Sequence, residues 1–275
     1  MIEFIKLILL GIAQGIAEFL PISSSGHLLL LEKLFNVSEP SLFLAQMLHF
    51  GTFLSVFVVF FKDIKRLFIA FFSQFKFLFN KDKQGFKLTS DQKMGWYIIL
   101  ASIPTAVIAF VFDDIFKEYY NNFNFLGFMF LSTAALLVFG DYFSKKNNHN
   151  EFTSINSFAI GCVQGLAILP GISRSGSTIF AGLFLNINKT NAAKFSFLIS
   201  LPATFGAFIF GIKDLIKNPT EIQFTFSIFV ATVVSFVVGI FAIKLLFKML
   251  EKSNFKYFSI YLILISALCF AVGLF

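Results

Sequence analysis

The sequence predicts an all-α polytopic membrane protein, and three observations lead to this fold class. Hydrophobic residues make up 57% of the chain and charged residues only 13%, whereas a soluble domain carries about 25% charged residues. Several apolar runs reach the roughly 20 residues that a helix needs to cross the hydrocarbon layer. The lysines gather between these runs, as they do in cytoplasmic loops. The net charge of +7 therefore does not indicate nucleic-acid binding.

Two kinds of apolar segment alternate along the chain. Six read as full membrane spans, over about 41–61, 93–112, 124–143, 191–212, 224–246 and 257–275. The regions 2–35 and 155–187 instead each contain an apolar helix, a break rich in Pro, Gly and Ser, and a second apolar helix of about 12 residues. Halves this short favour a re-entrant hairpin that enters and leaves on one side. Six spans and two hairpins give about ten expected helices.

The loop charges predict the orientation of the spans. The lysine-rich stretches 62–93, 144–154 and 244–256 are expected in the cytoplasm. The acidic stretch 113–123 and the mixed stretch 213–223 are expected to face outward. Six spans satisfy this assignment only if both termini lie outside. The first hairpin then enters from outside and the second from the cytoplasm.

An internal repeat relates the two hairpins. At a constant offset of 150, residues 11–27 match residues 161–177 at eight of 17 positions, including Gln-Gly and Ser-x-Ser-Gly. Each repeat contains one hairpin and three spans, and because three is odd, the second copy is inverted. Inverted repeats with broken helices place a polar site near the midplane. We expect one membrane domain over 1–275, with halves at about 1–145 and 151–275.

A Ser-x-Ser-Gly sequence precedes the second helix of each hairpin. Serines are good N-caps, and a helix N-terminus presents unpaired N–H groups that bind phosphate. Two such termini facing each other would hold a diphosphate from both sides. The alternative is that these residues only cap the helices. The candidate phosphate ligands are Ser23, Ser25, Gly26, Ser173, Ser175, Gly176 and Thr178.

Arg174 is the most informative single residue, because the chain has 20 lysines and only two arginines. An arginine between two serines, deep in an apolar region, indicates a role that lysine cannot fill. A planar guanidinium binds phosphate oxygens with two parallel hydrogen bonds and keeps its charge. The alternative is a structural ion pair with Glu18, which is compatible with phosphate binding.

Polar residues also lie on the first helix of each hairpin. Gln14 and Glu18 are four residues apart and share one helix face. An ionisable residue at membrane depth indicates function, and this carboxylate is a candidate to hold a divalent cation or to move a proton. Gln14 and its counterpart Gln164 are expected to support the site, with helix–helix hydrogen bonding as the alternative.

His27 follows the first serine cluster directly. It is a candidate general base for a nearby serine such as Ser24, a general acid for the leaving group, or a direct nucleophile. A lone histidine is more often structural, but this one lies three residues from Ser24. His49 lies within a predicted span, and lining the cavity and packing remain equal alternatives for it.

Two segments resemble the signature motifs of a known family. Residues 15–27 (Gly-Ile-Ala-Glu-Phe-Leu-Pro-Ile-Ser-Ser-Ser-Gly-His) and 170–178 (Pro-Gly-Ile-Ser-Arg-Ser-Gly-Ser-Thr) are similar to the motif pair of the bacterial undecaprenyl-diphosphatase family, also called the bacitracin resistance family. The resemblance covers the whole chain, including the stretch 101–104 (Ala-Ser-Ile-Pro). It implies hydrolysis of undecaprenyl diphosphate to the monophosphate in the bacterial plasma membrane, which recycles the carrier lipid for peptidoglycan synthesis.

The same resemblance implies the site residues. The essential His, Ser and Arg of the family fall on His27, Ser24 and Arg174, and its Glu-or-Gln, three residues, Glu motif falls on Gln14 and Glu18. Glu18 is then the only carboxylate of that pair, which weakens a model with two acidic metal ligands. A divalent cation, Mg or Ca, is implied, with Glu18 as its ligand and Gln14 as a second candidate. A homodimer is left open.

The expected mechanism is attack of Ser24 on the terminal phosphorus, assisted by His27 or Glu18, with Arg174 and the helix N-termini neutralising the phosphates. Attack by His27 or by activated water stays open. The rival reading is a transporter or flippase of a polyprenyl phosphate lipid, because inverted repeats with midplane hairpins are also transporter architecture. A flippase needs only groups that bind phosphate, whereas a phosphatase also needs a nucleophile and a proton acceptor.

Overall fold

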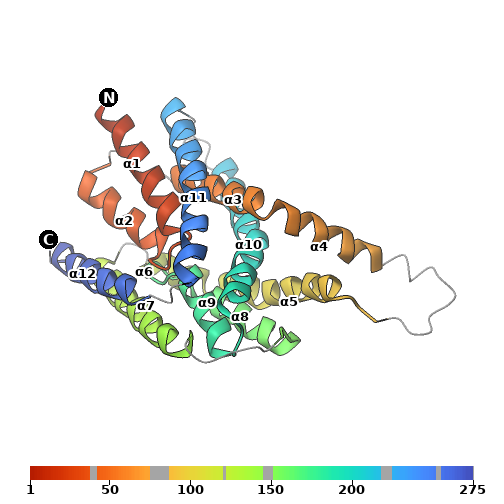
Figure 1. Cartoon of the computed structure of the whole chain (residues 1–275). Coiled ribbons are helices and arrows are strands. Elements are labelled where there is room, and N and C mark those ends of the chain that lie inside the picture. The colour runs from red at the N-terminus through yellow and green to blue at the C-terminus, as the bar shows by residue number, and fades with distance from the viewer. Residues whose placement is uncertain are drawn as a thin grey trace.

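The structure is a computed structural model of the chain. It describes residues 1–37, 42–74, 87–119, 122–144, 151–217, 225–251 and 255–274. These residues form twelve α-helices and contain no β-strand, which confirms the all-α fold class. Figure 1 shows helices that cross one another at several angles, with α9 and α10 packed together near the centre.

Both predicted hairpins are present as a helix, a break and a second helix. The first consists of α1 (Ile2–Ala17) and α2 (Ser24–Phe35). The second consists of α8 (Ser154–Leu166) and α9 (Arg174–Phe184). The longest of the four, α1, has 16 residues, which is short of the roughly 20 that a span requires. Each break therefore leaves polar backbone and serine side chains deep among apolar helices.

Four helices are long and apolar enough to cross a membrane. They are α5 (Ser90–Val111), α7 (Phe123–Ser144), α10 (Lys189–Lys217) and α11 (Phe226–Glu251). Each corresponds to a span predicted from the sequence. Pro104 in α5 and Pro202 in α10 lie inside these helices, which is tolerated where neighbouring helices and side chains satisfy the freed backbone groups.

The remaining two predicted spans are less regular. α3 (Leu42–Val59) continues into α4 (Phe61–Ser73) after a bend of 75°, and the two pass the length and hydropathy criteria only together. α12 (Lys256–Val272) is apolar but has only 17 residues. The described chain thus contains four spans by length and composition, or five if the bent pair counts as one.

Two predicted loops were wrong, because each contains a helix. α4 lies in the lysine-rich stretch 62–93, and α6 (Asp113–Tyr119) lies in the stretch 113–123. These two helices raise the total from the expected ten to twelve. In α4 the apolar side chains return at helical spacing between the charges, a pattern that the count of lysines concealed. Several loop lysines, Lys76, Lys81, Lys83, Lys145, Lys146 and Lys252, lie outside the described residues.

The two halves of the chain are interleaved. α1 packs along α11, and α8 packs along α5, so each hairpin lies against a helix from the opposite half. At these contacts Gly11 faces the backbone of Ala231, and Gly161 faces the backbone of Ala101. The two hairpin tips also touch, because the Gly171 N–H donates to Ser23 Oγ at 3.1 Å and Ser175 Oγ donates to the Leu20 carbonyl at 3.3 Å.

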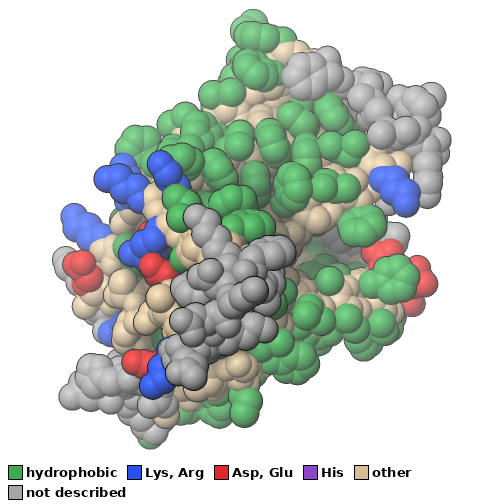
Figure 2. All heavy atoms as spheres, turned by 90° about the vertical axis from the view of Figure 1, so that its right-hand side faces the viewer, with side chains coloured by type: hydrophobic (Ala, Val, Ile, Leu, Met, Phe, Trp, Pro, Cys, Tyr) green, Lys and Arg blue, Asp and Glu red, His purple; other side chains and the backbone are tan. Residues whose placement is uncertain are grey.

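Large apolar side chains cover much of the outside. In Figure 2 hydrophobic side chains form a broad band, while charged side chains gather toward the left edge, with a smaller group at the right. Exposed Phe, Ile, Leu and Val residues lie on nearly every long helix, as Phe110, Phe210 and Phe241 illustrate. Patches of this extent do not occur on soluble monomers. The protein is therefore a multi-pass membrane protein.

The glycines at the helix contacts make a testable prediction about stability. A Cβ on Gly15 would lie 2.8 Å from both the Ser235 carbonyl oxygen and Val238 Cβ of α11, whereas a Cβ on Gly206 would meet nothing within 4 Å. We expect Gly15→Ala to lower the free energy of unfolding by roughly 1–3 kcal/mol through overpacking. Gly206→Ala is the matched control and should cause no loss. Thermal unfolding midpoints in detergent measure both, and equal midpoints would contradict the close packing of α1 on α11.

Candidate active site

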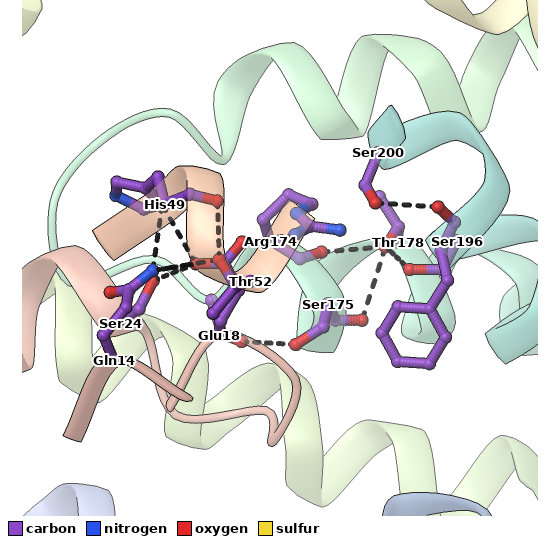
Figure 3. A network of polar contacts seen from close by, with 12 residues as sticks. Gln14, Glu18, Ser24, His49, Thr52, Arg174, Ser175, Thr178, Ser196 and Ser200 are labelled. Carbon is purple, nitrogen blue, oxygen red and sulfur yellow. Dashed lines mark hydrogen bonds and ion pairs between the residues drawn. The ribbon is translucent and has the colours of Figure 1, made fainter. Parts of the chain in front are cut away.

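The breaks in the two hairpins bring three functional side chains to one place. Glu18 is the C-cap of α1, Ser24 is the first residue of α2, and Arg174 is the first residue of α9. α3 adds His49 and Thr52 from the side. Figure 3 shows these side chains pointing toward one another, with Gln14 from the last turn of α1 beneath them.

Glu18 is the centre of this cluster. Its Oε1 accepts a hydrogen bond from Arg174 Nη2 at 2.5 Å, which is a salt bridge. Its Oε2 accepts from Ser24 Oγ at 2.6 Å and from Gln14 Nε2 at 3.0 Å. The side chains of Arg174 and Glu18 are only 18% and 9% exposed. Both predicted roles of Arg174, the ion pair and a place beside the serine cluster, therefore occur together.

Hydrogen-bonding capacity remains unused at this cluster. Arg174 Nη1 and Gln14 Oε1 are buried and have no hydrogen-bond partner among the residues that the structure describes. Leaving a buried donor or acceptor unsatisfied costs about 1–3 kcal/mol, so such atoms favour a ligand that completes them. A guanidinium with one nitrogen on a carboxylate and the other free is suited to receive an anionic oxygen.

A small pocket opens beside this cluster. Its free space is about 180 Å³ when the open solvent at its mouth is counted, and its interior is too narrow for a water-sized sphere. Glu18, Thr52, Arg174, Ser200 and Thr204 supply its polar lining. The apolar lining comes from Phe19, Phe53, Val56 and Leu201. A charged head and an apolar wall in one pocket suit an amphiphilic ligand.

Most of the predicted phosphate ligands instead cap helices or make hydrogen bonds within the protein. Ser23 and Ser173 are the N-caps of α2 and α9, and their hydroxyl oxygens accept from the N–H groups of Gly26 and Gly176. This is the capping alternative that the sequence left open.

The neighbouring residues are also engaged within the protein. Ser175 Oγ bonds the Leu20 carbonyl, and Thr178 Oγ1 bonds the Arg174 carbonyl at 2.8 Å and Ser196 Oγ at 2.6 Å. Ser25 is half-buried. Ser24 and Arg174 therefore remain as the tip residues whose side chains join Glu18.

The predicted supporting glutamines have different surroundings. Gln14 bonds Glu18 and also lies 2.9 Å from His49 Nδ1. Gln164, its counterpart in the second hairpin, donates to Thr105 Oγ1 at 3.2 Å and to the Ile199 carbonyl at 3.3 Å. Gln14 thus belongs to the charged cluster, whereas Gln164 makes the helix–helix hydrogen bonds that were its alternative reading.

His27 is not part of the charged cluster. Its Nδ1 lies 2.8 Å from the Ser23 carbonyl oxygen, and its Nε2 lies 2.8 Å from Tyr261 Oη of α12. Both ring nitrogens therefore have partners other than Ser24 and Glu18. Of the four predicted catalytic residues, the structure brings Glu18, Ser24 and Arg174 into contact and places His27 apart from them.

Sequence reasoning missed Thr52 and left His49 open. His49 Nδ1 lies 3.4 Å from Glu18 Oε2, and Gln14 Nε2 lies 3.5 Å from Thr52 Oγ1. The two residues are three apart, so they share one face of α3. Polar residues at helical spacing within an otherwise apolar span were the available signal, and Gly51 between them allows α3 to approach α11 closely.

The donor atoms present restrict how a divalent cation could be held. No group of three or more His, Cys, Asp or Glu side chains is arranged for a metal in the described parts of the chain. The hard oxygen donors at the site are the Glu18 carboxylate and the orphaned Gln14 Oε1. Mg²⁺ is often bound by one or two carboxylates together with substrate phosphates. These residues fit that mode and do not fit an all-protein cage.

Comparison with known proteins places the chain in a family. The family model described as "Bacitracin resistance protein BacA" matches residues 7–268. Similar proteins named undecaprenyl-diphosphatase occur in Alkaliphilus metalliredigens, at 41% identity over 93% of this chain and 94% of the relative, and in Halothermothrix orenii, at 36% identity over 99% and 96%. Another in Borrelia recurrentis is 37% identical over 98% of both chains. The chain belongs to the bacitracin resistance protein BacA family.

Proposed function

We propose that this protein is an undecaprenyl-diphosphatase, which hydrolyses undecaprenyl diphosphate to undecaprenyl phosphate and inorganic phosphate. The observation that carries the proposal is the hydroxyl of Ser24, held 2.6 Å from a carboxylate that is itself paired with a buried arginine. Relatives of 33–41% identity that bear this name support the substrate. Recycling of the carrier lipid for cell-wall synthesis is the corresponding biological role.

The first half of the mechanism follows from the contacts of Ser24. The terminal phosphate binds beside the Glu18–Arg174 pair and takes Nη1 of Arg174. Ser24 Oγ attacks the terminal phosphorus, its proton passes to Glu18 Oε2, and the bond from this phosphorus to the bridging oxygen breaks. Undecaprenyl phosphate leaves with that oxygen. Arg174 stabilises the charge that develops on the equatorial oxygens.

The second half returns the site to its starting state. The proton that Glu18 took from Ser24 leaves with the departing undecaprenyl phosphate, so Glu18 is a carboxylate again. Water then attacks the phosphoserine, Glu18 accepts a proton of this water, and it passes that proton to Ser24 Oγ as the bond from this oxygen to phosphorus breaks. Inorganic phosphate is released. Each of the two steps uses the same proton acceptor and the same guanidinium, which explains why one carboxylate suffices.

A divalent cation is proposed to assist this chemistry. Glu18 and Gln14 Oε1 would hold it together with the phosphate oxygens of the substrate. When bound, it would neutralise phosphate charge. The steps assigned above to Ser24, Glu18 and Arg174 are those of the protein's own side chains.

The flippase alternative is not favoured. Binding and moving a phosphate requires Arg174 and the helix N-termini, but it gives no reason for a serine hydroxyl hydrogen-bonded to a carboxylate. The deciding experiment measures inorganic phosphate released from a short-chain prenyl diphosphate by the detergent-purified protein, with Mg²⁺ and with chelator. Cation-dependent release supports the phosphatase. Folded protein that binds the lipid diphosphate without releasing phosphate would support the flippase.

Arg174→Lys is expected to lower this phosphate release by about 10²-fold. Lysine keeps the charge, but it cannot bind Glu18 with one nitrogen and phosphate with another in the fixed plane of a guanidinium. The matched control is Arg66→Lys, because the chain has only two arginines and the Arg66 side chain is 57% exposed. The control should stay within about twofold, since surface ion pairs contribute little. Equal activity of both variants would contradict bidentate use of Arg174.

We further propose that the halves 1–145 and 151–275 are inverted repeats within one membrane domain of the bacterial cell membrane, with both termini outside. The reciprocal packing of α1 on α11 and α8 on α5 supports the repeat, and the loop lysines support the orientation. Protease removal of a C-terminal tag from intact spheroplasts tests the orientation, and protection of the tag would contradict it.

A further inference from the structure

The ring of His27 is held on every side at the first hairpin tip. Its Nδ1 and Nε2 each have a partner 2.8 Å away, the Ser23 carbonyl oxygen and Tyr261 Oη. The Tyr261 ring stacks on it, with centroids 5.6 Å apart and planes at 11°, and the Phe130 ring meets it edge-on at 5.3 Å. His27 is 7% exposed. No ring nitrogen is left over for a substrate or for Ser24.

The partners determine the protonation pattern of the ring. A backbone carbonyl only accepts hydrogen bonds, so Nδ1 carries a proton. In the neutral ring, Nε2 then has a lone pair and accepts from the Tyr261 hydroxyl. The Ser23 carbonyl therefore selects the tautomer, and the Tyr261 hydroxyl, which can donate, matches it at Nε2.

The hydrogen bond from His27 to the Ser23 carbonyl matters because the backbone of Ser23 is strained. Its backbone has φ 68° and ψ 101°, a conformation that is strained in a residue other than glycine and persists only where the surroundings enforce it. Ser23 is also the N-cap of α2, and its hydroxyl accepts from Gly171 of the other hairpin. His27 adds a bond to the carbonyl of the peptide that leads directly into Ser24.

We propose that His27 is a positioning residue that acts through the Ser23 carbonyl, and that Tyr261 is a second positioning residue that holds the His27 ring in its orientation through the stacked ring and the hydrogen bond to Nε2. Together they fix the peptide before Ser24, so that the Ser24 hydroxyl stays 2.6 Å from Glu18 Oε2. This inference rests on the proposed function. Through Tyr261, helix α12 then takes part in the reaction although none of its residues lines the pocket.

Two amide substitutions separate the two nitrogens of His27. His27→Asn places an amide nitrogen near the position of Nδ1 and retains the donor to Ser23, whereas His27→Gln places it near Nε2 and loses that donor. We expect His27→Asn to keep phosphate release within about tenfold of the wild type. His27→Gln and His27→Ala should lose about 10²-fold, the cost of a misplacement of about 1 Å at a reacting group.

Tyr261→Phe removes one hydroxyl and retains the stacked ring, so it tests the proposal with the smallest change. We expect kcat to fall about tenfold with KM unchanged, because the substrate pocket is untouched and only the nucleophile is misaligned. Tyr257→Phe is the matched control on the same helix, where Tyr257 is 67% exposed, and it should leave both constants unchanged. Unfolding midpoints in detergent are measured for every variant.

The outcomes distinguish this inference from the proposed function. Wild-type protein that releases no phosphate would contradict the proposed function itself. Active wild-type protein with His27→Asn as inactive as His27→Ala would show that the imidazole itself takes part in the chemistry. Unchanged kcat in Tyr261→Phe would remove Tyr261 from the reaction. A fall in kcat for Tyr261→Phe, with rescue by Asn but not by Gln at His27, would establish the positioning role.

Discussion

Replacing Ser24 by Ala is expected to lower phosphate release by more than about 10³-fold, because it removes the nucleophile of the proposed two-step reaction. The Ser24 hydroxyl donates to Glu18 Oε2 at 2.6 Å. Among the described residues, no other serine of the first hairpin tip has a hydrogen bond to this carboxylate. Alanine leaves the backbone of α2 unchanged, since the capping hydroxyl belongs to Ser23. The measurement is inorganic phosphate released under single-turnover conditions.

The control variant changes a serine outside the site, and a more direct test detects phosphate on the nucleophile itself. Ser132 in α7 is exposed, and its hydroxyl donates to the Phe128 carbonyl of the same helix, so Ser132→Ala should retain full activity. Acid quenching of the wild type during turnover should trap a phosphoserine, which peptide mass spectrometry places at residue 24. A phosphate found on another residue, or an active Ser24→Ala variant, would require attack by water or by a different side chain.

The general architecture could be predicted from the sequence because its signals are long and repeated. Hydropathy runs predict long helices, and the constant offset of 150 residues identifies two hairpins whose tips share polar residues. Rare charges in apolar surroundings identify Glu18 and Arg174, because burying an ion without a partner is costly. The structure brings these two into contact at 2.5 Å.

The direction of individual side chains could not be predicted in the same way. His27 was expected beside Ser24 because the two are close in sequence, but its ring is turned by a partner 234 residues away, Tyr261. Ser23 was expected to bind phosphate because it precedes a helix N-terminus, yet its hydroxyl is occupied as an N-cap. Local sequence fixes which groups are available, whereas contacts between distant helices fix which of them face the pocket.

Glu18→Gln is expected to separate turnover from binding. Its amide cannot take the Ser24 proton, so kcat should fall by about 10²–10⁴-fold, the usual contribution of a general base. The substitution also leaves Arg174 without a counter-charge in a buried site, which typically costs about 3–5 kcal/mol of stability. The Glu18 carboxylate also repels phosphate bound to the neighbouring nitrogen of this guanidinium in the wild type, so the variant should bind phosphate more tightly even as it stops turning over.

Inorganic phosphate provides the measurement, because it reports on Arg174 without requiring turnover. A ligand that binds only the folded state raises the unfolding midpoint in proportion to its affinity. Phosphate should therefore raise the midpoint of Glu18→Gln more than that of the wild type, while Glu151→Gln, at an exposed position, should behave like the wild type. An equal or smaller rise in Glu18→Gln would mean that Glu18 helps to bind phosphate, through a cation, more than its negative charge repels phosphate. The sign of this single difference therefore decides whether the carboxylate acts mainly as a base beside the arginine or mainly as a metal ligand.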